Sequence, residues 1–422
     1  YKRQDYESGF PVRKVEVGVD VNLAETDPIE VAKDEGIMQR LGRFTDPESK
    51  ATLSPTAFFR YVACPLRFYF HSVARLQADD EIAEEVDAPM FGTILHAAVQ
   101  KLYARIVGEA HPGETLRAMI RTGEIAAAVE AAINENYLQD PAATTDDYTG
   151  NLLLVKDIVT RYLRGGVMPY DAAHDAFAVS GLEERVAYSF PFRAGERELE
   201  MKFGGIADRI DTLGDGALRV VDYKTGRRSF SLSDVVQGLN MQLLLYLFAL
   251  SASGERLYGL ETVPAGVLYV PARDVLLSAE GDLTDEELEQ KRAEKLRRSG
   301  LLLDDPAVLL AMERSESPLR LPVKWKEGVP TGESLATAER LGLLGRRVEE
   351  TLRRLAGELR AGSITADPCY KSAQDNACLW CEYAEACRFT EGEGGDRRRY
   401  LPKLSATRVW DILEGGGDDG GI

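Results

Sequence analysis

The stretch that most constrains the fold runs from Phe203 to Gly226 and reads FGGIADRIDTLGDGALRVVDYKTG. Two apolar runs with strand character, ADRIDTL and ALRVVDYK, flank the turn Gly214-Asp215-Gly216. Asp-Gly between two such runs is a strong hairpin signal. The sequence therefore predicts an antiparallel strand pair at this point of the chain.

Three charged side chains of this hairpin suit the hydrolysis of a phosphate ester. Asp208 lies on the first predicted strand, Asp222 lies on the second, and Lys224 follows two positions later. Side chains at i and i+2 of a strand share a face, so Asp222 and Lys224 point the same way. Two carboxylates beside a lysine fit a metal-dependent attack on phosphate. The competing interpretation is a set of strand-end acids paired with arginines such as Arg209, next to a surface lysine.

Two neighbouring helices carry polar residues on otherwise apolar patterns. His96 lies one position off the apolar face of the helix predicted over 91–107, where a structural histidine is the competing interpretation. An imidazole is also a common ligand in mixed nitrogen and oxygen metal sites. Gln242 and Tyr246 share a face of the helix predicted over 234–253. We interpret this pair as steering a nucleic-acid backbone or Lys224, against the alternative of a hydrogen bond satisfied within the core.

The cysteines form one local cluster with the spacing Cys378-x-x-Cys381-x5-Cys387. Three close thiols indicate a metal or cluster site, and both zinc and iron–sulfur sites need a fourth ligand. Cys369 is the nearest candidate in the sequence. Cys64 lies far upstream, at the end of an aromatic helix followed by proline. Local spacing favours Cys369 and leaves a zinc site without catalytic role open.

Composition bounds the protein class. Of the 422 residues, 44% are hydrophobic and 28% are charged, as in soluble globular proteins. A net charge of −18 argues against binding nucleic acid through bulk charge. Local positive charge is expected from Arg219, Lys224, Arg227 and Arg228. The chain has no apolar run of about 18 residues or more and no signal-peptide core, so we expect a cytoplasmic protein without a membrane span. The missing initiator Met suggests a fragment.

The motifs GTILH, GGIADRID, VVDYKTG and QLLLY, in that order, resemble the PD-(D/E)XK nucleases of the RecB-like branch. The resemblance covers roughly residues 51–400. The flanking cysteines look like the iron–sulfur staple of AddB-type helicase-nuclease subunits. The full-length subunits of that family carry a helicase-like region ahead of the nuclease, so the resemblance suggests that this chain is an excised C-terminal nuclease domain.

The resemblance implies a role for each motif residue. Lys224 would be the catalytic lysine, working with the carboxylates of Asp208 and Asp222. Gln242 and Tyr246 would match the Q-x-x-x-Y helix motif that positions DNA. The implied ligands of Mg²⁺ (or Mn²⁺) are His96, Asp208, Asp222 and the Tyr223 carbonyl.

The family pattern also implies a cluster assignment that differs from local spacing. Cys64 would be the fourth ligand of a [4Fe–4S] cluster, and Cys369 would be a bystander. The other three ligands would be Cys378, Cys381 and Cys387. Such a cluster would join the two ends of the domain.

The implied fold is α/β, a restriction-endonuclease-like core whose mixed central sheet is flanked by helices, with large helical additions. We expect a linker or arm over 1–50, a nuclease domain over 51–400 with a helical insertion over 280–362, and a tail over 401–422. A further helical stretch, 114–180, would help to shape a channel for a DNA strand.

The implied function is an exonuclease-type DNA nuclease in double-strand break processing and recombinational repair, acting on single-stranded ends, with a helicase-nuclease subunit as partner. Three alternatives remain: a RecB-like CRISPR-adaptation nuclease, a non-catalytic DNA-end-binding scaffold, and a zinc-stapled interaction protein. CRISPR-adaptation nucleases also carry one cysteine plus three, but they are much shorter than this chain.

Overall fold

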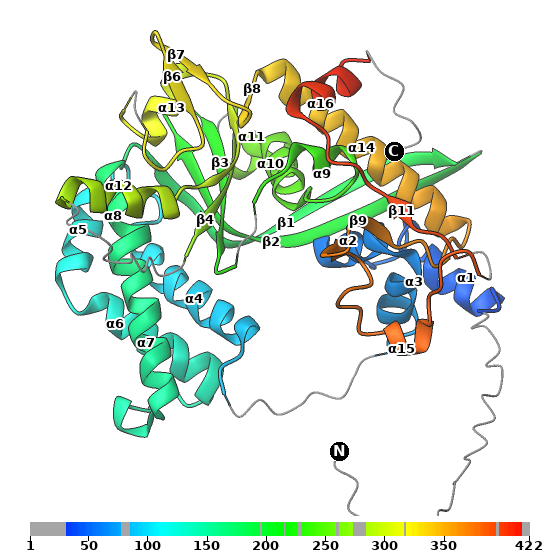
Figure 1. The fold of residues 1–422 in the computed structure, drawn as a ribbon, viewed down its shortest axis with the longest axis horizontal. Coiled ribbons are helices and arrows are strands. Elements are labelled where there is room, and N and C mark those ends of the chain that lie inside the picture. The colour runs from blue at the N-terminus through cyan, green and yellow to red at the C-terminus, as the bar shows by residue number, and fades with distance from the viewer. Residues whose placement is uncertain are drawn as a thin grey trace, which may run out of the picture. The chain divides into compact units, whose positions relative to one another are not determined.

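The fold was taken from a computed structural model of the chain (Figure 1). The described residues are 31–76, 85–194, 196–214, 216–226, 229–258, 261–272, 284–315, 318–393 and 396–415. The described residues from 33 onward form one compact unit. Asp215 of the predicted turn lies outside the described residues, as do Arg227 and Arg228.

A six-stranded mixed sheet forms the centre of the fold, with the order β1-β2-β3-β4-β5-β8. The β3–β4 and β5–β8 pairs are parallel and the other neighbours are antiparallel. A parallel pair needs a crossover connection, which α9 to α11 supply between β3 and β4. The strands are β1 (Ala178–Ala194), β2 (Arg197–Leu213), β3 (Ala217–Lys224), β4 (Val263–Pro271), β5 (Ser299–Leu303) and β8 (Leu335–Ala336).

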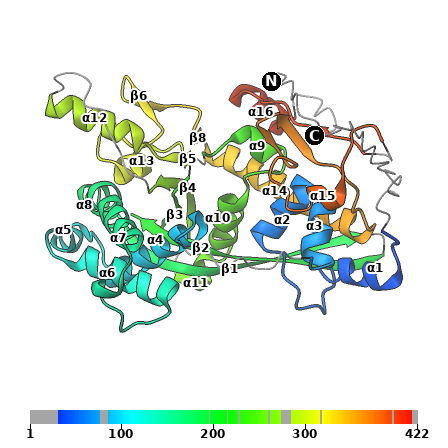
Figure 2. The same ribbon diagram turned by 60° about the horizontal axis from the view of Figure 1, so that its bottom comes forward.

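Helices flank this sheet, as expected for an α/β fold. The helix α10 packs on β3 and β4, whereas α4 and the helices after it share a separate buried core with Val221 and Leu268. Figure 2 shows α4 to α8 beside one end of the long β1–β2 pair and α1 to α3 beside the other. The helices up to β1 are α1 (Glu35–Gly42), α2 (Pro55–Ala63), α3 (Pro65–Phe68), α4 (Ala88–Tyr103), α5 (Gly113–Arg121), α6 (Glu124–Ile133), α7 (Gly150–Tyr162) and α8 (Met168–Ala173).

The second half of the chain adds further helices and two small sheets. One small sheet has the order β10-β9-β11 and the other pairs β6 with β7. The helices are α9 (Leu232–Val236), α10 (Gln242–Ala252), α11 (Gly254–Tyr258), α12 (Asp285–Lys295), α13 (Pro306–Met312), α14 (Ala338–Arg360), α15 (Ala384–Cys387) and α16 (Ala406–Leu413). The short strands are β6 (Lys324–Lys326), β7 (Val329–Thr331), β9 (Cys369–Ser372), β10 (Asp375–Asn376) and β11 (Arg399–Tyr400).

The predicted hairpin is present and forks at one end. The strands β2 and β3 pair only as far as the Arg209–Val221 step. Beyond it, β2 stays with β1, whereas β3 continues beside β4 up to Lys224. Figure 1 shows the β1–β2 ribbon running on past β3 and β4. In the antiparallel register, Asp208 and Asp222 are the next residues after the last pair, so both acids lie where the strands part.

The helix predicted over 234–253 is in fact two helices, α9 and α10. Gly238 and Asn240 adopt left-handed backbone conformations, with φ of +84° and +52°, which a right-handed helix cannot continue. The side chain of Ser231 caps α9 by accepting a hydrogen bond from the Asp234 N–H. Because of the break, Gln242 becomes the first residue of α10.

Three predicted segments differ from the structure in content. Residues 33–50 hold α1, whose Leu41 is fully buried and which contacts α14, so this part of 1–50 is not an extended arm. Residues 280–362 hold three helices, but they also supply β5 and β8 of the central sheet. Residues 401–415 of the expected tail include α16, which buries Trp410 against the body of the fold. Residues 416–422 lie outside the described residues.

The segment 280–362 was misjudged because its apolar strand is short. The five residues of β5 include a run of only three leucines, and a short apolar run does not separate strand from helix by periodicity. Across the part of the chain that the structure describes, no helix is both long and apolar enough to cross a membrane.

Candidate functional site

The fork of β2 and β3 holds the carboxylate of Asp208 in place through the backbone. The N–H of Tyr223 donates a hydrogen bond to Asp208 Oδ2 over 3.0 Å. Because β2 and β3 no longer pair at this position, the Asp208 side chain accepts the hydrogen bond from the Tyr223 N–H in place of a backbone carbonyl of β2. Where the two strands separate, a backbone hydrogen bond of the sheet is thus replaced by one that holds a carboxylate in place.

Two further ligand-type side chains meet Asp208. His96 Nδ1, on α4, lies 3.2 Å from Asp208 Oδ2 and 3.8 Å from Glu183 Oε1, on β1. One ligand atom from each of the three residues lies within 4.8 Å of the other two. An imidazole and two carboxylates are a donor set that suits Mg²⁺ or Mn²⁺. The donor chemistry therefore fits a hard divalent cation.

Glu183 is the site residue that sequence reasoning missed. It lies between the pairs Leu182–Arg209 and Glu184–Ala207, so it faces Asp208 across the β1–β2 pair. The sequence marks a strand from this residue onward, but only the register with β2 tells which acid of that strand meets Asp208. Glu183 has a left-handed backbone, with φ of +47°, which is a further mark of an unusual position.

Asp222 and Lys224 stand next to each other, as their spacing predicts. Lys224 Nζ lies 2.7 Å from Asp222 Oδ2, and it also lies 5.8 Å from the ring centroid of Tyr269 on β4. Asp222 is 3% exposed, whereas a quarter of the Lys224 side chain is exposed. The lysine therefore combines a buried anionic partner with access to a bound molecule.

Burial and neighbouring charges raise the proton affinity of Asp208 and of His96. Burial, and then the charge of Asp222, raises the pKa of Asp208 to about 7. Burial opposes the charged form of His96, but the Glu183 hydrogen bond and the charges of Asp208 and Asp222 outweigh it and raise the pKa of the imidazole. A cation bound by these side chains would therefore compete with protons for them.

The pair on α10 packs against β2 beside the fork. Gln242 Nε2 donates to the phenol oxygen of Tyr246 over 3.2 Å. Tyr246 is 2% exposed, so it acts from inside the protein and not by touching a ligand. A Cβ at Gly205 would lie 2.2 Å from the Tyr246 hydroxyl, which explains the glycine in the GGIADRID motif. The sequence brings Gln242 and Tyr246 onto one face, and the fold adds their contact with β2.

Two residues near the hairpin acids have buried partners elsewhere. Arg209 does not pair with Asp208 or Asp222, since its ion pairs go to Asp171 and Asp211. The prediction that Arg219 supplies local positive charge is wrong, because Arg219 is 2% exposed and its side chain pairs with Asp211.

Tyr223 presents its backbone N–H to Asp208, and its ring lies edge-on to the ring of His96 with centroids 6.4 Å apart. Its phenol points to the opposite side of β3, where it accepts a hydrogen bond from Arg209 Nη1 over 3.0 Å. Adjacent residues of a strand face opposite sides of a sheet. The main-chain atoms of Tyr223 therefore face the carboxylate of Asp208, while its ring contacts the imidazole of His96.

Four of the five cysteines line one cavity of about 200 Å³. They come from the junction of α2 and α3, the loop before α15, and α15 itself, and they are Cys64, Cys378, Cys381 and Cys387. Cys369 is buried on β9 and is not among the residues that line this cavity. The fold thus brings Cys64 to the C-terminal cysteines from across the chain.

Without a bound cation, the surroundings of this cavity favour the protonated thiol form of the cysteines over the thiolate. Burial, and then the charge of Cys64, raises the pKa of the Cys387 thiol to about 11. Burial also raises the pKa of Cys64 and Cys378. The cavity lining includes the side chains of three arginines, which are Arg67, Arg388 and Arg398.

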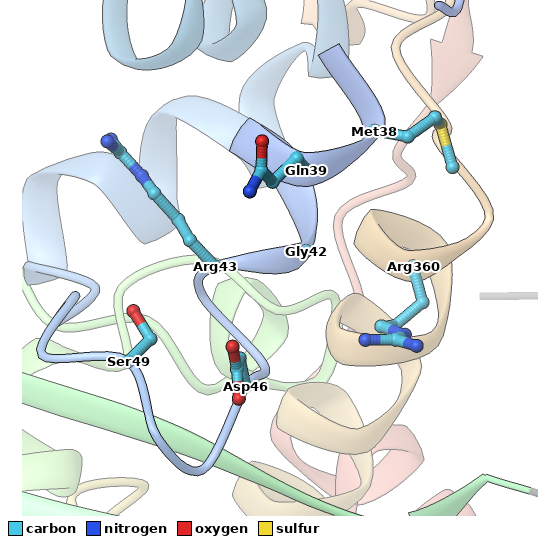
Figure 3. Close-up of a pocket in the computed structure, with 7 residues that line it drawn as sticks. All are labelled: Met38, Gln39, Gly42, Arg43, Asp46, Ser49 and Arg360. Carbon is cyan, nitrogen blue, oxygen red and sulfur yellow. The ribbon is translucent and has the colours of Figure 1, made fainter. Parts of the chain in front are cut away.

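A separate cavity of about 380 Å³ lies beside α1 and the end of α14 (Figure 3). Arg43, Asp46 and Arg360 are among the residues that line it. None of the residues predicted from the sequence to form a site lines it.

The comparisons with known proteins agree with this geometry. The family described as the PD-(D/E)XK nuclease superfamily matches residues 52–388. An ATP-dependent helicase/deoxyribonuclease subunit of Clostridium perfringens (strain SM101 / Type A) is 27% identical over 385 residues, which cover 88% of this chain and 33% of the relative. The subunit of the same name from Acetivibrio thermocellus is 28% identical over 377 residues, 86% of this chain and 32% of the relative.

A third relative with the same name, from Clostridium kluyveri (strain NBRC 12016), is 32% identical over 219 residues, which are 50% of this chain and 19% of the relative. The chain thus spans about a third of the length of the relatives that it matches most fully.

Proposed function

Because the chain belongs to the PD-(D/E)XK nuclease superfamily, we propose that it is a metal-dependent nuclease that hydrolyses DNA phosphodiester bonds at the β2–β3 fork. The observation that carries this proposal is the meeting of His96, Glu183 and Asp208 beside the Asp222–Lys224 pair. The name of the relatives, which are helicase/deoxyribonuclease subunits, points to the same substrate class.

The proposed cation ligands are His96, Asp208 and Asp222, with the Tyr223 carbonyl and with Glu183 added by the structure. A bound Mg²⁺ or Mn²⁺ supplies Lewis-acid stabilisation of negative charge on the phosphate and activation of water. His96 and Asp208 are common to the predicted ligand set and to the group of side chains that the fold brings together. The Tyr223 N–H anchors Asp208, and Lys224 pairs with Asp222.

Lys224 stabilises the negative charge that develops on the phosphate group. Its ammonium is held beside Asp222, so the positive charge is oriented before the substrate arrives. Gln242, half-buried at the start of α10, is close enough to Tyr246 to be held by it and positions the DNA backbone next to the lysine. These assignments give each polar residue at the fork one task.

We further propose that the substrate is single-stranded DNA ends and that the reaction is exonucleolytic, in the processing of double-strand breaks for recombinational repair in the cytoplasm. The name of the relatives supports a helicase-nuclease assembly with a partner subunit. The helices between 114 and 180, and those between 280 and 362, would form the walls that guide the strand.

The four cysteines that share a cavity support a [4Fe–4S] cluster on Cys64, Cys378, Cys381 and Cys387. Four thiolates on a single zinc ion lie about 3.8 Å apart. Within the described part of the chain, no three cysteine sulfurs come within 4.8 Å of one another. A four-iron cluster places iron and sulfide between its ligands and so suits wider spacing. The arginines in the lining offset the charge of the thiolates.

The proposed nuclease is tested on end-labelled single- and double-stranded DNA, with and without Mg²⁺. The wild-type chain should degrade single-stranded ends only with the cation. Asp222→Ala should lower the rate by about two orders of magnitude or more, because several kcal/mol of charge stabilisation are lost. Glu198→Ala, which removes an exposed acid on β2 ten residues before Asp208, is the control and should keep the rate. Equal rates for Asp222→Ala and the wild type would overturn the assignment.

A further inference from the structure

A buried ionic network lies behind the fork, on the opposite side of β2 and β3 from the proposed site. Asp171 on α8 receives Arg209 Nη1 at 2.5 Å and Arg298 Nη2 at 3.0 Å. Arg209 also donates through Nε to Asp211 at 2.6 Å, and Arg219 binds the other oxygen of Asp211 at 2.6 Å. All five side chains are at most 4% exposed.

Tyrosine hydroxyls complete the hydrogen bonding of this network. Tyr103, on α4, donates to Asp171 Oδ2 over 2.7 Å, and Tyr223 accepts from Arg209 over 3.0 Å. At the far end, Tyr170 donates to Glu313 over 3.0 Å, and its ring lies 3.8 Å from the guanidinium carbon of Arg298. With Glu313 included, the network has equal numbers of carboxylates and guanidiniums, so its formal charge is zero.

Three of the four elements that carry the proposed metal ligands, α4, β2 and β3, also contribute to this network. Arg209 directly follows Asp208 on β2, and Tyr223 directly follows Asp222 on β3. Tyr103 lies about two turns after His96 on α4. Neighbouring residues of a strand face opposite ways, so a shift of the network moves the carboxylates at the fork. Ion pairs excluded from water also tolerate little change in geometry.

We propose that this network, centred on Asp171, is a positioning device for the metal site: it fixes α4, β2 and β3 relative to one another so that His96, Asp208 and Asp222 converge. This inference rests on the proposed function, because it gives the network a purpose only if those residues hold a cation. The residues of the network touch neither the cation nor the substrate.

The test uses variants that remove one hydroxyl each, and the readout is Mn²⁺ binding by titration calorimetry on the full chain. Tyr103→Phe and Tyr223→Phe should each weaken Mn²⁺ binding by about tenfold, the usual effect of disturbing the residues that support metal ligands. Asp171→Asn would remove the carboxylate that binds both Arg209 and Arg298, and the loss of this buried ion pairing would destabilise the fold. The test therefore relies on the phenylalanine variants.

Tyr170→Phe is the matched control. It also removes one buried tyrosine hydroxyl from the network, but the partner of that hydroxyl is Glu313. Tyr170 reaches Arg209 of β2 only through Arg298 and Asp171. The control should bind Mn²⁺ as the wild type does, with a similar loss of melting temperature. If Tyr103→Phe and Tyr223→Phe bind as the wild type does, or if Tyr170→Phe weakens binding equally, the positioning role is refuted.

The outcome also separates this inference from the proposed nuclease. A wild-type chain that binds Mn²⁺ but cleaves no DNA would remove the nuclease assignment and leave the positioning role intact. A wild-type chain that binds no Mn²⁺ would remove both.

Discussion

At the scale of single residues, the chemistry of Asp208 depends most on its neighbours. Burial and the charge of Asp222 raise its pKa to about 7, so a proton competes with the cation below that pH. Mn²⁺ affinity, measured by calorimetry, should therefore fall by about tenfold for each pH unit below 7 and level off above it. A second proton competes with the cation at His96, because the neighbouring acids raise the pKa of its imidazole. An affinity that stays constant from pH 6 to pH 8 would contradict this assignment.

The same pKa shift has an opposite consequence for the metal-free protein. The folded chain binds a proton at Asp208 more tightly than the unfolded chain does. The contribution of this group to the free energy of unfolding is thus largest below pH 4 and is lost as the pH rises through 7. Adding Mn²⁺ at pH 8 should raise the melting temperature, because the cation replaces the proton among the carboxylates.

His96 provides a second test at the residue scale. His96→Ala removes the nitrogen ligand while leaving the carboxylates in place. We expect the Mg²⁺ concentration for half-maximal cleavage to rise by about tenfold or more. An unchanged metal titration would return His96 to a structural role on α4.

Gly205 shows how a small residue serves the site. In Gly205→Ala, the new Cβ would lie 2.2 Å from the Tyr246 hydroxyl, so Tyr246 or β2 must move. We expect a loss of about 1 to 3 kcal/mol in the free energy of unfolding, measured with urea. Gly92→Ala is the control, since a Cβ there meets no atom within 4 Å and α4 gains a better helix former. The control should be at least as stable as the wild type.

At the scale of elements, α16 belongs to the folded body even though the sequence suggests a tail. Its Trp410 is 5% exposed and stacks at 4.7 Å on the guanidinium carbon of Arg340 of α14. Trp410→Ala should lower the free energy of unfolding by about 3 kcal/mol or more, from lost burial and a cavity. Trp380→Ala removes the same side chain where it is 87% exposed, and it should cost far less. Equal losses for the two variants would place α16 outside the cooperative fold.

Elements also show where local patterns reach their limit. The strands of the hairpin follow from alternating apolar residues and an Asp-Gly turn, and both signals are local. The break between α9 and α10 follows from left-handed conformations at Gly238 and Asn240, which the apolar run around them hides. The strand β5 could not be predicted because its run of three leucines fits either a helix or a strand.

At the scale of the whole molecule, the proposed cluster would tie α2 and α3 to the C-terminal α15. Closing so long a loop of chain restricts the unfolded state and stabilises the fold. Cys64→Ser should lose the broad visible absorption and most of the bound iron of the purified protein, and it should melt at a lower temperature.

Cys369→Ser is the matched control for this prediction, because it replaces a buried cysteine that does not line the cavity. It should retain iron and colour. If Cys369→Ser loses the iron while Cys64→Ser keeps it, the ligand assignment is wrong, and a colourless zinc-containing wild type would exclude the cluster altogether.

The sequence by itself determined the residue types of the site, the hairpin that carries Asp208, Asp222 and Lys224, and the mixed α/β class. These depend on turn chemistry and on periods of a few residues, which are written locally in the chain. Only the tertiary structure decided that Glu183 joins His96 and Asp208, that Cys64 meets the C-terminal cysteines, and that Arg209 turns away to Asp171. Each of these depends on register or packing between distant segments, where a shift of one residue in a strand would exchange the two faces.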